Sequence, residues 1–197
     1  MSGTMSGTID VEAILRAIEI NDLTFIDFLP VLAPEISLDL SNEEGLTPLY
    51  LAAQLGNLPA GRTLLNHGAN PDFVYAVRDR HGWAPLLTAM AEGHEDIVTV
   101  LLDAGANPSL TSTDGEQDSP LLFAIEDGRE EMVELLLERG ARITPRITDT
   151  AADGPSRAIE RLIESDRPRW SPLRNAWYIA VERAVIGRKI NQQAAVF

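Results

Sequence analysis

The chain has 197 residues, which is enough for one domain or for a short array of repeats. Its 30 acidic and 16 basic residues give a net charge of −14, which excludes free nucleic acid as an expected partner, because phosphate binding needs a basic surface. The absence of cysteine excludes disulfides, thiolate-bound zinc, iron–sulfur clusters and thiol nucleophiles. No apolar run reaches the roughly 18 residues of a membrane-spanning helix, so we expect a soluble, cytoplasmic protein that does not enter a membrane.

The N-terminal part of the chain predicts a leader and two short helices. Residues 1–8 repeat the tetrapeptide Met-Ser-Gly-Thr and have neither the basic region nor the apolar run of a signal peptide, so we expect a disordered leader. The segment Ile9–Ile20 predicts a first helix, and Phe25 and Leu29 mark the apolar side of a second one. Asn21-Asp22 is then the turn between them.

Residues 42–143 contain three similar segments, in which a proline near the start of an apolar run is followed by a glycine and later by a Gly-Ala pair. The prolines are Pro48, Pro85 and Pro120, the middle glycines are Gly56, Gly93 and Gly128, and the Gly-Ala pairs begin at Gly68, Gly105 and Gly140. Proline is tolerated in the first turn of a helix, and a glycine after a helix favours a left-handed conformation. Each segment therefore predicts two helices with a turn at the middle glycine.

Apolar residues spaced four apart, such as Ile97 and Leu101, indicate the second helix of each segment. One helix pair cannot bury its apolar face alone, so neighbouring pairs are expected to stack into a solenoid. The first of the three segments is unusual, because Ala60 and Gly61 stand where the next segment carries Ile and Val. Either bulkier residues of the N-terminal helices fill this space, or the segment is locally flexible.

The C-terminal part of the chain predicts three more helices. Within residues 144–166, Ile147–Ala152 and Ser156–Ile163 indicate a shortened helix pair. Residues 167–197 include a predicted helix, Pro172–Lys189, with one apolar stripe formed by Leu173, Trp177, Ala180, Val181 and Ala184. This helix can be an independent site or can pack on the last pair, and its aromatic residues favour packing.

Three copies of a unit close to 33 residues long, opened by Thr-Pro-Leu or a variant of it, resemble the ankyrin repeat. The resemblance is clear from Asn42 to Ala141. It implies an all-α solenoid of helix–turn–helix units with short β-turn fingers, in the order capping repeat (9–41), three repeats (42–143), shortened capping repeat (144–166) and helical extension (167–197). Tyr50, Leu87 and Leu122 replace the histidine of the family's Thr-Pro-Leu-His motif, so we expect packing to hold these turns.

The resemblance also implies a protein-binding concave face, formed by the finger tips and the exposed sides of the first helices. Carried over repeat by repeat, it gives the partner-binding residues that we predict: Glu43, Glu44, Leu46, Gln54, Arg80, His81, Trp83, Glu92, Asp114, Glu116, Asp118, Glu126 and Asp127. Eight of these are carboxylates. Trp83 lies in the middle repeat, and a central tryptophan surrounded by charged residues is typical of a binding hot spot.

The charge is distributed unevenly along the chain. Residues 1–45 carry nine acidic residues and one basic residue, residues 46–140 carry fifteen and five, and residues 141–197 carry six and ten. The acidity therefore belongs to the repeats, and it predicts a protein partner with a basic surface. The alternative is that an acidic surface merely keeps the protein soluble.

No catalytic or metal-binding motif stands out. The only histidines are His67, His81 and His94. His67 and His94 occupy positions where ankyrin repeats commonly carry histidine, which favours a structural role. The run from Asp114 to Asp118 is similar to the start of a calcium loop, but it lacks the glycine and the final glutamate that such a loop needs. We therefore expect no enzyme activity, no cofactor and no metal.

The sequence thus favours a non-enzymatic protein-binding module whose acidic concave face binds and blocks a basic protein, as an immunity protein or antitoxin does. One alternative is an adaptor that bridges two partners through the concave face and the C-terminal helix. Others are a bacterial effector directed at a host cell, or an enzyme or metal-binding protein whose site has no recognisable motif. A monomer is favoured, and the sequence names neither the partner nor the oligomeric state.

Overall fold

The computed structural model describes residues 10–34, 36–74, 83–111, 119–154 and 156–166. This part of the chain contains ten α-helices and no β-strand. They are α1 (Val11–Glu19), α2 (Leu23–Leu32), α3 (Pro48–Leu55), α4 (Leu58–Asn66), α5 (Pro85–Glu92), α6 (Glu95–Asp103), α7 (Pro120–Glu126), α8 (Glu130–Glu138), α9 (Pro145–Asp153) and α10 (Arg157–Asp166). The predicted leader and the predicted C-terminal helix lie outside the described residues.

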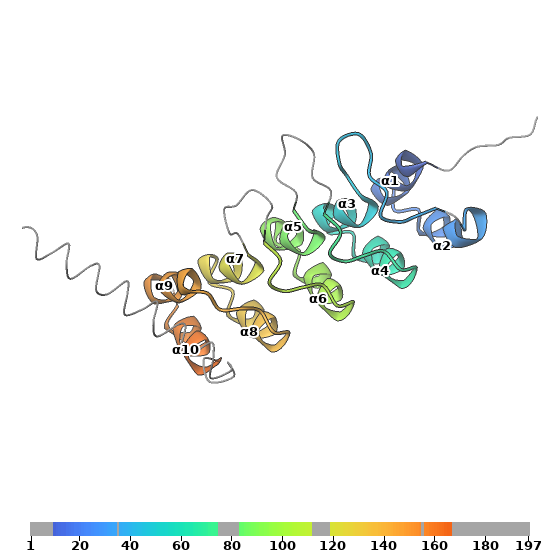
Figure 1. Cartoon of the computed structure of the whole chain (residues 1–197). Helices are drawn as coiled ribbons and strands as arrows, with labels where there is room; N and C mark the ends of the chain where they lie inside the picture. The colour runs from blue at the N-terminus through green and yellow to red at the C-terminus, as the bar shows by residue number, and fades with distance from the viewer. Residues whose placement is uncertain (1–9, 35, 75–82, 112–118, 155, 167–197) are drawn as a thin grey trace, which may run out of the picture.

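The helices form five consecutive pairs that stack along one direction (Figure 1). The first helices of the pairs, α1, α3, α5, α7 and α9, form one row, and the second helices form another row beside it. The pair α1–α2 lies at one end of the stack and the pair α9–α10 at the other. The predicted all-α solenoid of helix–turn–helix units is thereby confirmed.

The first helices begin where the sequence signals place them. In α3, the hydroxyl of Thr47 accepts a hydrogen bond from the backbone N–H of Tyr50 (3.2 Å), and Pro48 occupies the first turn. Proline fits there because an N–H at that position would have no partner inside the helix. Ser119 and Thr144 cap α7 and α9 in the same way. Hydrogen bonds therefore hold these turns together with the packing that we expected.

The turn inside most pairs depends on a residue in the left-handed conformation. Gly56, Gly93 and Gly128 have φ angles of +64°, +79° and +69°. The N-terminal pair uses Asn21 instead, with a φ of +57°. Asparagine adopts this conformation more readily than most other residues, and the predicted turn at Asn21-Asp22 is confirmed.

One continuous apolar core runs through the stack between the two rows of helices. Every pair contributes buried side chains to it, among them Ile14, Ile18, Ile26, Leu29, Leu64, Leu86, Ile97, Leu101, Ile125, Leu136, Ile147 and Ile163. Within the described ranges, no buried polar side-chain atom lacks a hydrogen-bond partner. The pairs are therefore joined by apolar burial, as expected for units that cannot bury their own apolar face.

Hydrogen bonds between neighbouring pairs join three of the second helices to the first helix of the preceding pair. In each, the residue at the N-terminus of the second helix contacts a backbone carbonyl near the end of that first helix. The contacts are Asn57 Nδ2 to Ile18 O (2.9 Å), His94 Nε2 to Gln54 O (3.1 Å) and Arg129 Nη1 to Met90 O (3.3 Å). Three different side chains thus make the same junction contact.

The segments that connect the pairs are joined by a second series of hydrogen bonds, in which a backbone N–H donates to a side chain one repeat earlier. These are Asn70 N to Asp39 Oδ1, Asn107 N to Asp72 Oδ1 and Arg142 N to Ser109 Oγ, each 2.8 Å long. They fix the position of each connecting segment on its neighbour, and so they position the side chains that these segments present.

Two expectations from the sequence need correction. The last pair is not shortened, because α9 and α10 have nine and ten residues, and α9 begins at Pro145 behind the Thr144 cap. The space beside Gly61 is not filled by the N-terminal helices. A Cβ atom on Gly61 would lie 3.0 Å from Cδ1 of Ile97, so a side chain of α6 fills it.

Candidate functional site

Eight of the thirteen predicted partner-binding residues belong to the described part of the chain. They are Glu43, Glu44, Leu46, Gln54, Trp83, Glu92, Glu126 and Asp127. All eight lie on first helices or on the segments next to them. The remaining five, Arg80, His81, Asp114, Glu116 and Asp118, lie outside the described residues. The described candidates thus follow the row of first helices from α3 to α7.

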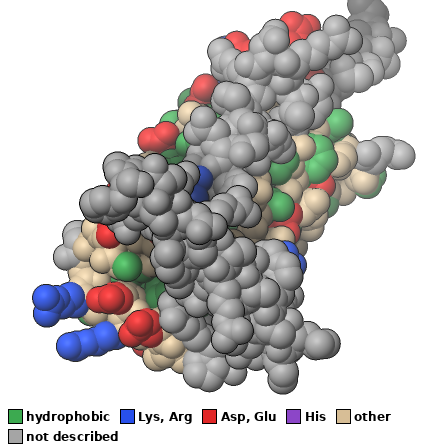
Figure 2. Space-filling model, turned by 60° about the vertical axis from the view of Figure 1, so that its left-hand side comes forward, with side chains coloured by type: hydrophobic (Ala, Val, Ile, Leu, Met, Phe, Trp, Pro, Cys, Tyr) green, Lys and Arg blue, Asp and Glu red, His purple; other side chains and the backbone are tan. Residues whose placement is uncertain are grey.

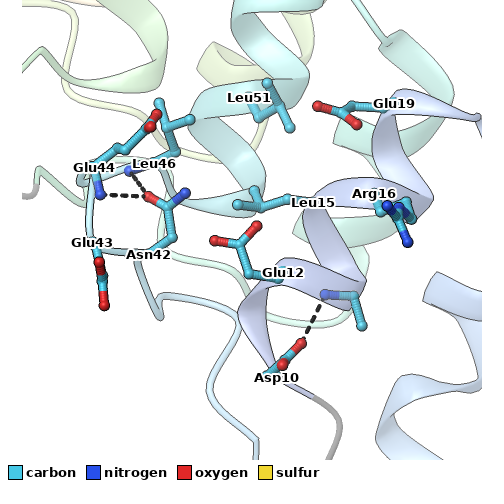
Figure 3. A pocket seen from close by; sticks show the side chains of 11 residues that line it. Asp10, Glu12, Leu15, Arg16, Glu19, Asn42, Glu43, Glu44, Leu46 and Leu51 are labelled. Carbon is cyan, nitrogen blue, oxygen red and sulfur yellow. Dashed lines mark hydrogen bonds between the residues drawn. The ribbon is translucent and has the colours of Figure 1, made fainter.

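A hollow of about 690 Å³ lies between α1 and the segment that leads into α3 (Figure 3). We call it the N-terminal hollow, and its lining residues are Asp10, Glu12, Ala13, Leu15, Arg16, Glu19, Asn42, Glu43, Glu44, Leu46 and Leu51. Five of these side chains are carboxylates and one is basic. Three of the predicted residues, Glu43, Glu44 and Leu46, line it. The hollow therefore gathers predicted residues with acidic residues of α1.

Asn42 holds the loop side of the N-terminal hollow in place. Its side-chain oxygen accepts hydrogen bonds from the backbone N–H groups of Glu44 (3.0 Å) and Leu46 (2.9 Å). Its own backbone N–H donates to the carbonyl of Leu46 (3.1 Å). These bonds close a tight turn at Gly45, which has a φ of +83°. The exposed side chains of Glu43 and Glu44 are therefore presented from a fixed turn.

The α1 side of the hollow carries functional candidates that the sequence analysis missed. In Figure 3, Glu12 and Glu19 lie on the α1 side, Glu43 and Glu44 lie on the loop side, and Leu15 lies between them. The sequence held a signal for this. Glu19 stands two residues before the left-handed Asn21, as Gln54 stands two residues before Gly56. The predicted concave positions belong to the three clear repeats and do not include α1.

Trp83 lies two residues before α5 and is half-buried. Its ring makes an edge-to-face contact with Phe123 of α7, with ring centroids 6.0 Å apart and an interplanar angle of 62°. This geometry is a favourable one for two aromatic rings. Trp83 therefore joins two neighbouring repeats and still keeps part of its surface exposed.

Farther along the row of first helices, acidic and basic residues are more evenly mixed. The carboxylate of Asp127 forms an ion pair with Arg129 (2.5 Å). Glu126 lines a second hollow, of about 590 Å³, together with Arg146, Asp149, Thr150, Asp153 and Gly154. Figure 2, whose view brings the α9–α10 end forward, shows both acidic and basic side chains there. Three acidic residues and one basic residue thus line the second hollow, against five and one at the N-terminal hollow.

The two described histidines make structural contacts. Nε2 of His67 lies 3.5 Å from a carboxylate oxygen of Asp27. The His94 ring covers Gly56 and bonds to the carbonyl of Gln54. His81 lies outside the described residues. In the part of the chain that the structure describes, no three His, Asp or Glu side chains form a group that could hold a metal ion.

Among the described helices, none is both long enough and apolar enough to cross a lipid bilayer.

Two sequence patterns of known families match the chain. The family described as Ankyrin repeats (3 copies) matches residues 14–112, and the family described as Ankyrin repeat matches residues 116–149. The first match begins in α1, and the second ends in α9. The matched region therefore includes the N-terminal pair, the three clear repeats and most of α9.

Curated relatives carry the same repeats. The chain is 31% identical over 109 residues to Protein phosphatase 1 regulatory subunit 27 of Mus musculus, covering 50% of this chain and 68% of that protein. It is 39% identical over 77 residues to Ankyrin repeat and SAM domain-containing protein 6 of Mus musculus, covering 39% of this chain but 8% of that protein. The chain therefore belongs to the ankyrin repeat family, whose repeats serve as protein–protein interaction modules.

Proposed function

We propose that the N-terminal hollow and the adjoining row of first helices bind a protein with a basic surface, and that binding blocks this surface. The repeats make the chain a protein–protein interaction module. Its acidic charge and the N-terminal hollow favour a partner with a basic surface. The observation that carries the proposal is the N-terminal hollow, where five carboxylates and one arginine surround leucine side chains.

A lysine or arginine side chain suits the N-terminal hollow in two ways. Its aliphatic part can cover Leu15, Leu46 and Leu51, while its charged end stays at the carboxylates of the rim. Arginine can in addition bind one carboxylate through two parallel hydrogen bonds. The hollow thus offers both apolar and ionic contacts to a basic side chain of a partner.

Electrostatic attraction supports binding before any contact forms. A net charge of −14, with five carboxylates at one hollow, raises the rate at which the chain meets a basic partner. Salt weakens this attraction, because the screening length is about 10 Å at 0.1 M ionic strength. One relative is named a regulatory subunit, and a chain that covers the basic surface of its partner would likewise control another protein by binding.

The test is affinity capture from a lysate of the source cells at low and high salt, followed by mass spectrometry. The variant Glu43→Lys with Glu44→Lys reverses two charges at the hollow. The matched control is Glu134→Lys with Glu138→Lys, which makes the same charge change at exposed positions of α8. We expect the wild type and the control to retain a basic protein that high salt releases, and the hollow variant to lose it.

The captured protein is then purified and its own activity is measured with and without the chain. A partner that binds the hollow variant and the α8 control equally well contradicts the proposed site. A partner that binds through the hollow but keeps its full activity contradicts the blocking role and favours an adaptor.

A further inference from the structure

The second helix of the N-terminal pair carries apolar side chains on its outside. Phe28, Val31 and Leu32 of α2 are 58%, 75% and 59% exposed. Residues three and four apart share one face of a helix, so these three side chains form one surface, which we call the α2 patch. Their exposure contrasts with Ile26 and Leu29 of the same helix, which are buried in the core.

The other repeats show that stacking does not require apolar residues at the positions of Val31 and Leu32. Counted from the residue before each second helix, Val31 corresponds to Asn66, Asp103 and Glu138, and Leu32 corresponds to His67, Ala104 and Arg139. All six of these residues are exposed, and five are polar or charged. At these two positions the inner repeats therefore present mostly polar residues, so Val31 and Leu32 are available for another contact. The residues that correspond to Phe28 are less exposed: Thr63, Val100 and Leu135.

The charge around the α2 patch indicates what can cover it. Asp27, beside Phe28 on the same helix, has 62% of its side chain exposed. Residues 1–45 carry nine acidic residues and a single arginine. A second α2 patch would bring like charges together, which is unfavourable at an interface. An apolar segment flanked by basic residues would complement the patch in both respects.

The chain itself contains such a segment beyond α10. Residues 167–197 carry six basic residues and one acidic residue. The predicted helix Pro172–Lys189 places Leu173, Trp177 and Val181 on one stripe, and Arg174 and Arg183 are next to members of that stripe in the sequence. This segment therefore has apolar side chains that can cover the α2 patch and a positive charge that complements the acidic residues around it.

The predicted helix of one chain cannot place its Leu173–Trp177 end on the α2 patch of the same chain. The helices α2 and α10 lie at opposite ends of the row of second helices (Figure 1). Four steps of 8–10 Å between neighbouring helices separate them by about 35 Å. The five residues 167–171 span at most about 17 Å when extended. A contact that uses the whole apolar stripe, Leu173 and Trp177 included, therefore needs the helix of a second copy.

We propose that the α2 patch binds the predicted helix 172–189 of a second copy of this chain. The contact is head-to-tail, since the two surfaces that meet are different, and it can add further copies unless a ring closes. It places the copies end to end and does not depend on the function proposed for the N-terminal hollow.

The test is sedimentation of the full-length chain over a wide range of concentrations. The α2 variant, Val31→Asn with Leu32→His, introduces the residues that α4 carries at the same positions. The tail variant is Arg174→Glu with Arg183→Glu. The control Leu55→Gln removes another exposed leucine, which lies at the end of α3. Circular dichroism spectra identical to that of the wild type show which variants keep their helices.

We expect the mass of the wild type and of the Leu55 control to rise above the 21.5 kDa of one chain as concentration increases. The association of each of the other two variants should be weakened at least about tenfold, which corresponds to about 1.4 kcal/mol. An equimolar mixture of these two variants should form a 1:1 dimer, because the α2 variant keeps its tail and the tail variant keeps its α2 patch.

Three results overturn the proposal: a wild type that is monomeric throughout, a tail variant that associates as strongly as the wild type, or a mixture that does not associate. If the tail variant does not fold, a synthetic peptide of residues 167–197 is added to the wild type instead. The peptide should dissociate the assembly and should bind the α2 variant about tenfold more weakly. A peptide that leaves the assembly intact also overturns the proposal.

Discussion

The first helix pair and the pairs that follow share a backbone arrangement but differ in their surfaces. In α3–α4, α5–α6 and α7–α8 the turn uses glycine, and the outer end of the second helix is mostly polar. In α1–α2 the turn uses Asn21, the outer end of α2 is apolar, and α1 contributes carboxylates to the N-terminal hollow. A pair at the end of the stack has only one neighbour, so fewer of its side chains are committed to stacking.

The largest expected effect is a difference in the free energy of unfolding between substitutions on the buried side and on the exposed side of α2. Leu29 is 1% exposed and Leu32, three residues later, is 59% exposed. Leu29→Ala should reduce the free energy of unfolding by about 2–5 kcal/mol, because it leaves a cavity in the core. Leu32→Ala should change it by no more than about 0.5 kcal/mol. Denaturant unfolding of dilute samples measures both, and equal losses would show that Leu32 belongs to the core.

A smaller effect is expected at the glycines of the inner repeats. Gly56 and Gly68 both have positive φ angles, but a Cβ atom on Gly56 would lie 2.6 Å from the His94 ring, whereas nothing lies within 4 Å of one on Gly68. Gly68→Ala should cost about 1–2 kcal/mol through backbone strain alone. Gly56→Ala should cost more, because His94 must also move away from its bond to Gln54. Thermal unfolding compares the two, and a similar loss in both would contradict this role of His94.

The packing of Gly61 against the next repeat can be tested by a double-mutant cycle. Alanine within a helix is about 1 kcal/mol more favourable than glycine, but a Cβ on Gly61 would lie 3.0 Å from Cδ1 of Ile97. Gly61→Ala should therefore raise the free energy of unfolding less in the wild type than in a chain that also carries Ile97→Val, which removes Cδ1. The two substitutions should couple by about 0.5–1 kcal/mol in unfolding experiments. Simple additivity would mean that Ile97 does not fill the space.

The smallest expected effect concerns pH at the start of α2. The side chain of Asp22 accepts hydrogen bonds from the hydroxyl of Thr24 (2.6 Å) and the N–H of Phe25 (3.2 Å), and these bonds lower the pKa of its carboxyl group. Its stabilising contribution is complete above the ordinary aspartate pKa and is lost as the pH falls through the lowered value.

Asn57 caps α4 in the same position without a titrating group. Asp22→Asn should therefore flatten the acidic part of the stability profile, measured by unfolding at a series of pH values. A profile identical to that of the wild type would show that Asp22 does not contribute to it.

Much of the fold could be predicted because the signals are local. Pro48, Gly56 and the equivalent residues of the next repeats mark where helices begin and end, and the Asn21-Asp22 turn follows the same spacing. The shortened last pair was a wrong prediction, although Thr144-Pro145 repeats the Thr47-Pro48 start of α3. The Thr-Pro signal marks the start of α9 two residues before the apolar pattern begins at Ile147.

The candidate site was harder to predict because it depends on contacts between segments distant in the sequence. The loop side of the N-terminal hollow was predicted from Glu43 and Glu44, but its other side comes from Glu12 and Glu19 of α1. Spacing alone does not show that these two groups of carboxylates face each other. Similarly, the sequence did not show that Ile97 packs beside Gly61, because this contact forms only when repeats stack.

Calorimetric titration with the captured protein measures whether the N-terminal hollow binds a basic partner. Four carboxylates of the hollow are replaced by amides in one variant, Glu12→Gln, Glu19→Gln, Glu43→Gln and Glu44→Gln, and four exposed carboxylates of α8 in its control, Glu130→Gln, Glu131→Gln, Glu134→Gln and Glu138→Gln. We expect the hollow variant to bind at least about tenfold more weakly than the control and to lose most of its salt dependence. Equal affinities and equal salt dependence in the two variants would contradict it.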